Sequence, residues 1–578
     1  MKSLLKYLKA YVKESILGPL FKLLEATFEL IVPLLIADIV DIGIASGDKG
    51  YVLQKCGMLV LLGVVGLVFS ITAQYFSARA AVGASTGLRH ALFAHIQKLS
   101  YTEIDKLGTS TMITRMTSDI NQVQSGINLT LRLLLRSPFV VFGAMVMAFT
   151  VNVKAAWSFA VVIPLLSIVV FSIMAASIPL YRRVQQRLDK VLSTTRENLT
   201  GVRVIRAFCK EEEEIRIFEQ QTDELRTTQK FVGKISALMN PLTYVLINAA
   251  IIALIYTGAI QVEAGIITQG AVLALYNYMS QILVELVKMA NLIINITKSI
   301  ACAKRIEAVF GIKPSVTEKE TTVESTDDSV AVRFENAALT YAGASEPSIS
   351  GLNLTVKKGE TVGVIGGTGC GKTSLIQLIG RFSDATEGAV YVDGVNVKDY
   401  KLDLLRDKIG MVMQKSVLFH GSIRDNIRWG KKDATDEEIW NALTAAQAKE
   451  VVENKEGKLD ALVEQGGRNF SGGQRQRLTI ARALVKKPSI LILDDAASAL
   501  DYATDAALRK AIKELPDAPT TFIVSQRAAS IRYADQIVVL DDGEVVGIGT
   551  HEQLLAGCPV YEEIYYSQFE REEAAVNG

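Results

Sequence analysis

TVGVIGGTGCGKTSLIQLIG, residues 361–380, decides the fold of the second half of this chain. An apolar run with strand character leads into GGTGCGKT (Gly366–Thr373), and a helical pattern follows directly. The order strand, GxxxxGK[ST] loop and helix is the context in which this motif binds phosphate. Its glycines let backbone N–H groups turn toward phosphate oxygens at the start of a helix. The stretch therefore predicts a nucleotide-binding α/β domain.

The loop also predicts individual roles. Lys372 is expected to reach the β- and γ-phosphates of ATP, and the Thr373 hydroxyl is expected to ligate Mg²⁺. The expected ATP contacts are Gly366, Gly367, Thr368, Gly369, Cys370, Gly371, Lys372, Thr373 and Ser374.

A second motif lies further along the chain, where the apolar run SILILDD ends in two acids, Asp494 and Asp495. Asp494 is expected to hold Mg²⁺, and Asp495 stands where a general base or water-positioning carboxylate is needed. Short β-rich runs alternate with helix-like segments from about Val330 onward. This alternation predicts an α/β domain with a partly parallel sheet.

The first half of the chain has a different composition. Six largely apolar stretches are long enough to cross a bilayer, at 16–40, 55–78, 128–151, 156–180, 237–261 and 267–297. Two polar, basic links, after the second and fourth stretches, are expected to be helical and to face the cytoplasm. We therefore predict a six-helix membrane domain over 1–316, a linker over 317–329 and the nucleotide-binding domain over 330–578 in the cytoplasm.

Charge and cysteine content exclude some classes. The chain has 62 Lys and Arg against 61 Asp and Glu, so nothing favours a nucleic-acid partner. Its five cysteines are scattered without a CxxC pair, so neither a disulfide framework nor a zinc site is expected.

The segment FSGGQ gives the chain a specific resemblance. Its residues resemble the ABC signature LSGGQ and are Phe470, Ser471, Gly472, Gly473 and Gln474. Six spans with two long links, and GVRVIRAFCKEEEE in the second link, are similar to ABC exporters of the type IV fold with fused domains. The resemblance implies that this signature contacts ATP held by a second half-transporter chain.

Further positions of that family follow in order. Tyr341 resembles the aromatic residue that stacks on adenine, and Gln414 resembles the glutamine that senses Mg²⁺ and the membrane domain. Glu464 stands where exporters carry an acidic contact to the cytoplasmic links. The D-loop SALD corresponds to Ser498, Ala499, Leu500 and Asp501. Contacts that couple the two domains are expected near Tyr101–Gly108 and Arg206–Glu213.

Two positions depart from the family. The acid after the Mg²⁺ ligand is Asp495 instead of Glu, and Gln526 stands in place of the switch histidine. The shorter carboxylate is set back by roughly 1.5 Å, and a misplacement of about 1 Å can cost about 100-fold in rate. The chain thus resembles the degenerate-site subunit of bacterial heterodimeric multidrug exporters. A homodimer with two slow sites remains the alternative.

The substrate is specified only broadly. The resemblance implies export of hydrophobic or amphipathic compounds through the cell membrane, with a lipid flippase as the alternative. Charged residues lie in or near the apolar stretches: Glu25, Glu29, Arg132, Arg136, Glu285 and Lys288. They either line a cavity, or Glu285 and Lys288 pair on one helix face while the arginines extend to the membrane interface.

Overall fold

The computed structural model describes residues 6–318, 329–341 and 343–569, in two compact units. The first unit contains the chain up to Gln97 and Thr109–Ile312, and the second contains Lys98–Gly108 and the chain from Lys313 onward. Most of the predicted linker, residues 319–328, lies outside the described residues.

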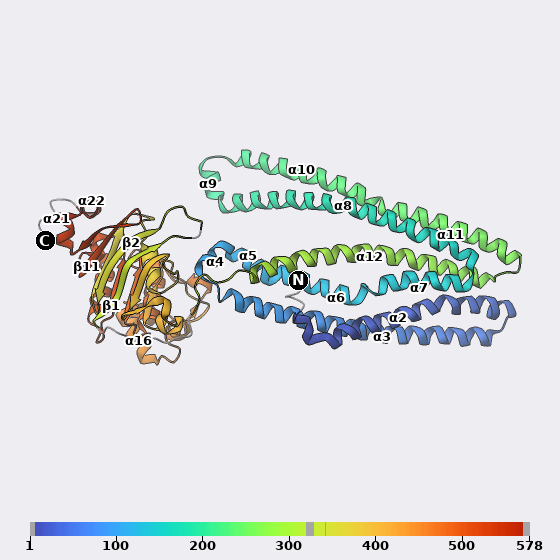
Figure 1. Ribbon diagram of the computed structural model, residues 1–578, viewed down its shortest axis with the longest axis horizontal. Helices are drawn as coiled ribbons and strands as arrows, with labels where there is room; N and C mark the ends of the chain where they lie inside the picture. Colours follow the sequence, from blue (N-terminus) through green and yellow to red (C-terminus); the bar gives the residue numbers. More distant parts are fainter. Residues whose placement is uncertain (1–5, 319–328, 342, 570–578) are drawn as a thin grey trace. The chain divides into compact units, whose positions relative to one another are not determined.

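The first unit is built from helices (Figure 1). They are α2 (Val12–Asp38), α3 (Lys49–Ile96), α5 (Thr109–Thr114), α6 (Ile120–Leu133), α7 (Arg136–Val151), α8 (Val153–Thr200), α9 (Val202–Ala207), α10 (Glu211–Ala237), α11 (Met239–Glu263) and α12 (Gln269–Phe310). Helices α3 and α8 have 48 residues each, which corresponds to about 72 Å at 1.5 Å per residue. They are thus much longer than a bilayer requires, as expected if the polar links continue the membrane helices.

Membrane-spanning character follows from length and composition. Five helical stretches are long and apolar enough to cross a membrane: Lys49–Ile96, Thr109–Val151, Val153–Thr200, Glu211–Glu263 and Gln269–Phe310. Helix α2, the first predicted span, has 27 residues and packs beside α3, but Lys22, Glu25 and Glu29 reduce its apolarity. The prediction of a multi-span helical membrane domain is confirmed.

The start of α7 and the packing of α7 against α2 and α12 determine where Arg136 lies in the first unit. The helix is interrupted at Leu134 and Leu135, between α6 and α7, so that Arg136 is the first residue of a new helix. Around it, α2, α7 and α12 pack against one another, and Leu166, Leu254, Tyr278 and Met279 are fully buried in the same unit.

The second unit contains a six-stranded sheet in the order β12-β11-β3-β10-β9-β6 and a four-stranded antiparallel sheet in the order β2-β1-β4-β5. The strands are β1 (Val330–Leu339), β2 (Ile349–Lys357), β3 (Thr361–Gly366), β4 (Glu387–Val392), β5 (Val395–Asn396), β6 (Ile409–Val412), β7 (Gly421–Ser422), β8 (Leu462–Val463), β9 (Ile490–Asp494), β10 (Thr520–Val524), β11 (Gln536–Asp541) and β12 (Glu544–Gly549). All neighbours from β11 to β6 are parallel, which confirms the α/β prediction.

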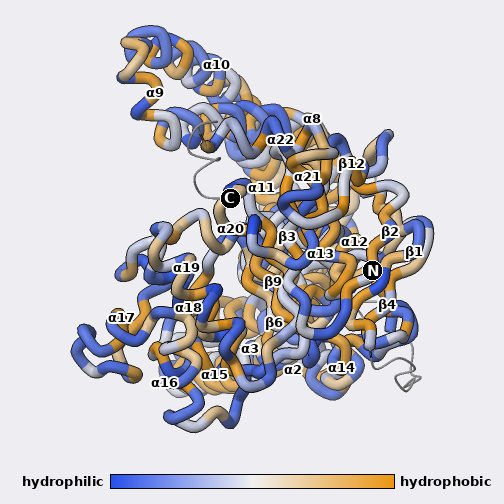
Figure 2. Tube along the Cα trace, turned by 90° about the vertical axis from the view of Figure 1, so that its left-hand side faces the viewer, coloured by the Kyte–Doolittle hydropathy of each residue, from blue (hydrophilic) through white to orange (hydrophobic). Residues whose placement is uncertain are grey.

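Helices accompany these strands. They are α4 (Tyr101–Leu107), α13 (Lys372–Ile379), α14 (Leu402–Asp407), α15 (Ile423–Arg428), α16 (Asp436–Ala445), α17 (Lys449–Glu453), α18 (Gly472–Leu484), α19 (Tyr502–Lys513), α20 (Ala528–Ile531), α21 (His551–Gly557) and α22 (Pro559–Tyr566). The inner strands β3 and β9 are hydrophobic, as Figure 2 shows, because both faces of a parallel sheet are covered.

Strand register places the functional motifs at one edge. Val524 of β10 is aligned with Val364 of β3 on one side and with Asp494 of β9 on the other. Because parallel strands end at the same edge of a sheet, the segments after β3, β9 and β10 meet there.

Candidate nucleotide-binding site

The phosphate loop connects β3 to α13 and is shaped by its glycines. Gly369 and Gly371 have φ values of +87° and +97°, in the region that side chains rarely adopt. At Gly371 a Cβ would also lie 2.3 Å from the Ser348 carbonyl oxygen. Lys372 folds over the loop, where its Nζ donates to the carbonyl oxygens of Gly366 at 2.9 Å and Gly367 at 2.5 Å. The ammonium is thus held over the concave side of the loop.

A hydroxyl and a carboxylate meet beside this loop. The Thr373 Oγ1 donates to the Asp494 carboxylate at 3.4 and 3.5 Å. Burial, reinforced by the neighbouring Asp495, raises the pKa of Asp494 to about 6. Hydroxyl and carboxylate oxygens are ligands that Mg²⁺ accepts alongside water and phosphate oxygens. The two side chains therefore fit the Mg²⁺ site of a nucleoside triphosphate. A bound cation would favour the ionised form of the Asp494 carboxyl group.

Asp495 has an unusual backbone. Its φ of +49° lies in the left-handed region, where Asp is tolerated better than most residues. The Asp495 N–H donates to the Val524 carbonyl at 3.0 Å, and the Ser498 hydroxyl donates to the Asp495 carbonyl at 2.7 Å. Two fixed backbone contacts prevent the shorter side chain from being advanced by a main-chain shift. Gln526, which follows β10 by two residues, is exposed at the same edge.

The signature segment forms a capped helix N-terminus. Ser471 caps α18, accepting from the Gln474 N–H at 3.3 Å, while the Gln474 side chain accepts from the Ser471 N–H at 3.0 Å. Phe470 is 5% exposed and belongs to the core, so its replacement of Leu is a packing change. A Cβ on Gly473 would lie 2.9 Å from the Ala499 carbonyl oxygen, so the main chain of the D-loop packs directly against the signature segment.

The structure brings some predicted residues together and leaves others apart. In the part of the chain that it describes, no hydrogen bond joins residues 470–474 to the loop 366–373. Gln414 and Glu464 are both exposed. The Tyr341 hydroxyl contacts Ser374 Oγ at 3.1 Å and donates to Gln377 at 3.0 Å, so it lies beside α13.

Two arginines were missed by sequence reasoning. Arg527, next to Gln526, donates to the carbonyl oxygens of Ala497, Ser498 and Leu500 at 3.0–3.2 Å. These hydrogen bonds connect the segment that contains Gln526 to the D-loop. Arg482 on α18 donates to the Val417 carbonyl and to Asn426, and burial lowers its pKa to about 10. Neither carries a local sequence signal, because their acceptors are backbone carbonyls distant in the chain.

The predicted coupling segments differ in their contacts. Within the second unit, the ring of Tyr101 packs on that of Phe382 at 5.1 Å, and Ser100 Oγ accepts from the Val316 N–H at 3.1 Å. The described contacts of α4 are thus with Phe382 and the chain near Val316, not with Gln414 or Glu464. In the second segment, Phe208 is 73% exposed within the chain.

Comparisons with known proteins agree with this geometry. The model of the ABC transporter transmembrane region matches residues 15–286, and that of the ABC transporter matches residues 349–498. An uncharacterized ABC transporter ATP-binding protein of Mycobacterium tuberculosis is 37% identical over 95% of each chain. An ATP-dependent lipid A-core flippase of Desulfotalea psychrophila is 33% identical over 82% of this chain and 83% of its own. A bacterial Atm1-family ABC exporter with ATP bound has the same fold, with a TM-score of 0.80, 22% identity and coverage of 97% and 98%.

Proposed function

Since the chain belongs to the ABC transporter family and fuses a transmembrane region to an ATP-binding domain, we propose that it is the degenerate-site subunit of a heterodimeric exporter. Its substrates are amphipathic or hydrophobic compounds, and its own ATP site hydrolyses slowly. A different chain, carrying Glu and His at the two altered positions, supplies the competent site.

The pair Asp495 and Gln526 carries this proposal. Both residues follow adjacent parallel strands and lie at the edge where the phosphate loop begins. Gln526 can donate a hydrogen bond to a γ-phosphate, but it brings no positive charge. Asp495 is one methylene too short and its main chain is held at both N–H and C=O. Both changes weaken the activation of water and leave nucleotide binding intact.

The remaining groups retain their roles in this site. The loop Gly366–Thr373 binds phosphate through its N–H groups and Lys372, and Tyr341 stacks on adenine. Thr373, Asp494 and Gln414 would hold Mg²⁺, which would supply positive charge to the phosphate groups of ATP. The D-loop, held by Arg527, aligns the edge of the site that faces the partner.

Two observations support a second chain. Ser471 and Gly472 are exposed at the start of a capped helix of 13 residues, a geometry that binds anions and here lacks a contact to the chain's own phosphate loop. Around α9, Val204 and Phe208 are 60% and 73% exposed, which is a large apolar surface for a polar link. A partner's nucleotide and a partner's ATP-binding domain would cover these surfaces.

A homodimer and a lipid flippase are the alternatives. The similarity to a relative named lipid A-core flippase favours a lipid-like substrate. This alternative concerns the transported compound, and the proposed asymmetry of the two ATP sites does not depend on it.

The test is ATP hydrolysis by the purified full chain, alone and mixed with candidate partner half-transporters. We expect ATP binding with very slow turnover for the chain alone, and a large increase on pairing. Hydrolysis by the chain alone at a typical enzyme turnover, about 10 per second, would refute the subunit assignment.

A further inference from the structure

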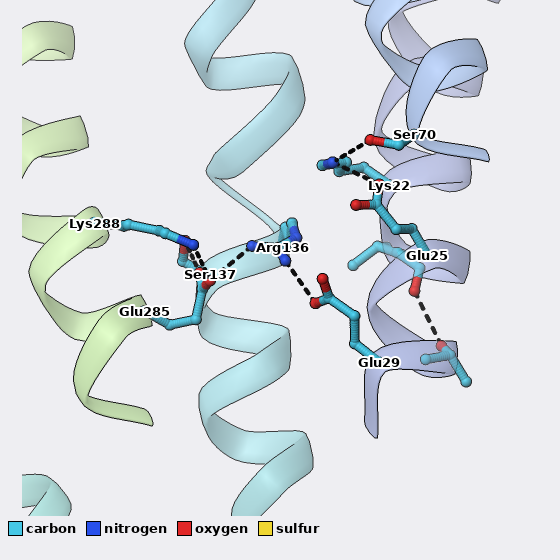
Figure 3. A network of polar contacts seen from close by, with 10 residues as sticks. Lys22, Glu25, Glu29, Ser70, Arg136, Ser137, Glu285 and Lys288 are labelled. Carbon is cyan, nitrogen blue, oxygen red and sulfur yellow. Dashed lines mark hydrogen bonds and ion pairs between the residues drawn. The ribbon is translucent and has the colours of Figure 1, made fainter. Parts of the chain in front are cut away.

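A network of charged side chains connects three helices of the membrane unit (Figure 3). Arg136, at the start of α7, lies between Glu29 of α2 and Glu285 of α12, and donates to them at 2.6 and 2.7 Å. Glu285 also accepts from Ser137 Oγ and Lys288 Nζ, both at 2.9 Å. The expectation that Arg136 extends to the membrane interface is therefore wrong. The expectation that Glu285 and Lys288 pair on one helix face is confirmed.

Burial differs sharply among these four ions. The Arg136 and Glu285 side chains are 8% and 5% exposed, whereas those of Glu29 and Lys288 are 44% and 48% exposed. The centre of the network is thus an inner ion pair, and its two ends are one accessible carboxylate and one accessible ammonium. The four formal charges sum to zero.

A cavity of about 410 Å³ opens onto both accessible ends. This volume is within the range of small-ligand sites. Its walls include Glu29, Arg136 and Lys288, and its apolar lining is provided by Val32, Pro33, Ile36, Val140 and Val284. It therefore combines a dipolar patch with an apolar surface.

Hydrogen-bonding capacity remains unused around this cavity. Arg136 Nε is buried, and no described residue accepts its proton; Gln281 Oε1, in the cavity wall, has no described donor. Glu29 uses one carboxylate oxygen on Arg136, and Lys288 uses one of its three protons on Glu285. Both accessible ends of the network therefore keep hydrogen-bonding capacity for a ligand.

We propose that this cavity binds an amphiphile whose head group is a zwitterion, with a primary ammonium on Glu29 and a phosphate or carboxylate on Lys288. The substrate class deepens the proposed export function and rests on it. The alkyl part of the molecule lies against the apolar lining.

Charge balance distinguishes this ligand from singly charged ones. A lone cation or anion would leave one end of the network without a partner and one net charge uncompensated next to the buried Arg136–Glu285 pair, which is costly. A zwitterion matches both ends and keeps the site neutral. Among the described residues that line the cavity none is aromatic, so the aromatic cage that favours a quaternary ammonium is missing.

The test measures binding to the full-length chain in nanodiscs with four compounds that share a dodecyl chain. These are dodecylphosphoethanolamine, dodecylphosphocholine, dodecyl phosphate and dodecylammonium, and free phosphoethanolamine is the fifth probe. We expect dodecylphosphoethanolamine to bind roughly tenfold more tightly than the others, as for loss of one charge-assisted hydrogen bond. Equal binding of free phosphoethanolamine would overturn the assignment to an amphiphile.

Two substitutions should change the preferred charge in opposite directions. Glu29→Gln leaves the network with a net positive charge, so dodecyl phosphate should become the best ligand. Lys288→Met leaves a net negative charge, so dodecylammonium should become the best ligand. The control Lys298→Met removes an exposed lysine ten residues further along α12 and should keep the wild-type order.

An unchanged order of affinities in both variants would overturn the proposal, as would wild-type preference for a singly charged compound. A thermal unfolding midpoint near that of the wild type identifies folded variants. These measurements require no ATP. Fast hydrolysis by the chain alone would refute the proposed subunit role and leave the binding result standing.

Discussion

Replacing Asp495 by Glu should restore much of the missing hydrolytic activity of this chain's own site. The substitution adds one methylene and advances the carboxylate by roughly 1.5 Å. Because the Asp495 N–H and C=O are both hydrogen-bonded, at 3.0 and 2.7 Å, the main chain cannot make the same adjustment in the wild type. A misplacement of about 1 Å can cost about 100-fold, so we expect a gain of about 10- to 100-fold in the chemical step.

The substitution also carries a cost in stability. Asp495 has φ +49°, and longer side chains are less favourable in this region, by about 1–2 kcal/mol for a typical residue. Asp542→Glu is a matched control for the backbone strain, because Asp542 has φ +43° in the exposed turn between β11 and β12 and does not follow the Mg²⁺ ligand Asp494. It should show a similar loss of stability without any gain in rate.

The assay is single-turnover cleavage of ATP, with the chain in excess over nucleotide so that product release does not limit the rate. Asp495→Asn serves as the negative variant and should be slower than the wild type. If Asp495→Glu cleaved ATP no faster than the wild type, the short carboxylate would not be what limits this site.

Other variants test separate parts of the structure. Lys372→Ala should abolish ATP binding, measured by equilibrium titration with a fluorescent nucleotide, since it removes the ammonium held over the loop; unchanged affinity would contradict the phosphate-loop assignment. Arg136→Met should destabilise the membrane unit by about 3–5 kcal/mol because it leaves Glu285 buried without its main partner, whereas Arg136→Met with Glu285→Leu should recover much of that loss, as judged by denaturant midpoints. Arg527→Ala should lower hydrolysis in the paired exporter without changing nucleotide affinity at this site, because it frees two D-loop carbonyls and that of the preceding Ala497; a parallel loss of affinity would argue against a positioning role. Burial lowers the pKa of His551 below 6.5, so neutral His551 stabilises the fold above pH 6.5 and this contribution is lost as pH falls through the lower folded-state value. His551→Gln should therefore reduce the change in unfolding midpoint between pH 7.5 and pH 5, and an unaltered change would exclude this histidine as its source.

The nucleotide-binding features could be predicted from sequence because each is local. The phosphate loop needs glycines and Lys372 in a fixed order, and the capping box at Ser471 and Gln474 needs residues three apart. Likewise, the run that ends at Asp494 identifies a buried strand from composition alone. The two departures, Asp495 and Gln526, were visible for the same reason.

Tertiary structure decided what depends on residues far apart in the chain. Sequence predicts a charge at Glu29, Arg136 and Glu285 but cannot tell which pair and which remain accessible; their separations in sequence are 107 and 149 residues. The contacts of Arg527 and Arg482 could not be predicted from the sequence, because every residue has a backbone carbonyl and none of them marks the acceptor. Short motifs determine local geometry because all their residues are close in sequence. The neutral charge network and its cavity form only when α2, α7 and α12 pack together.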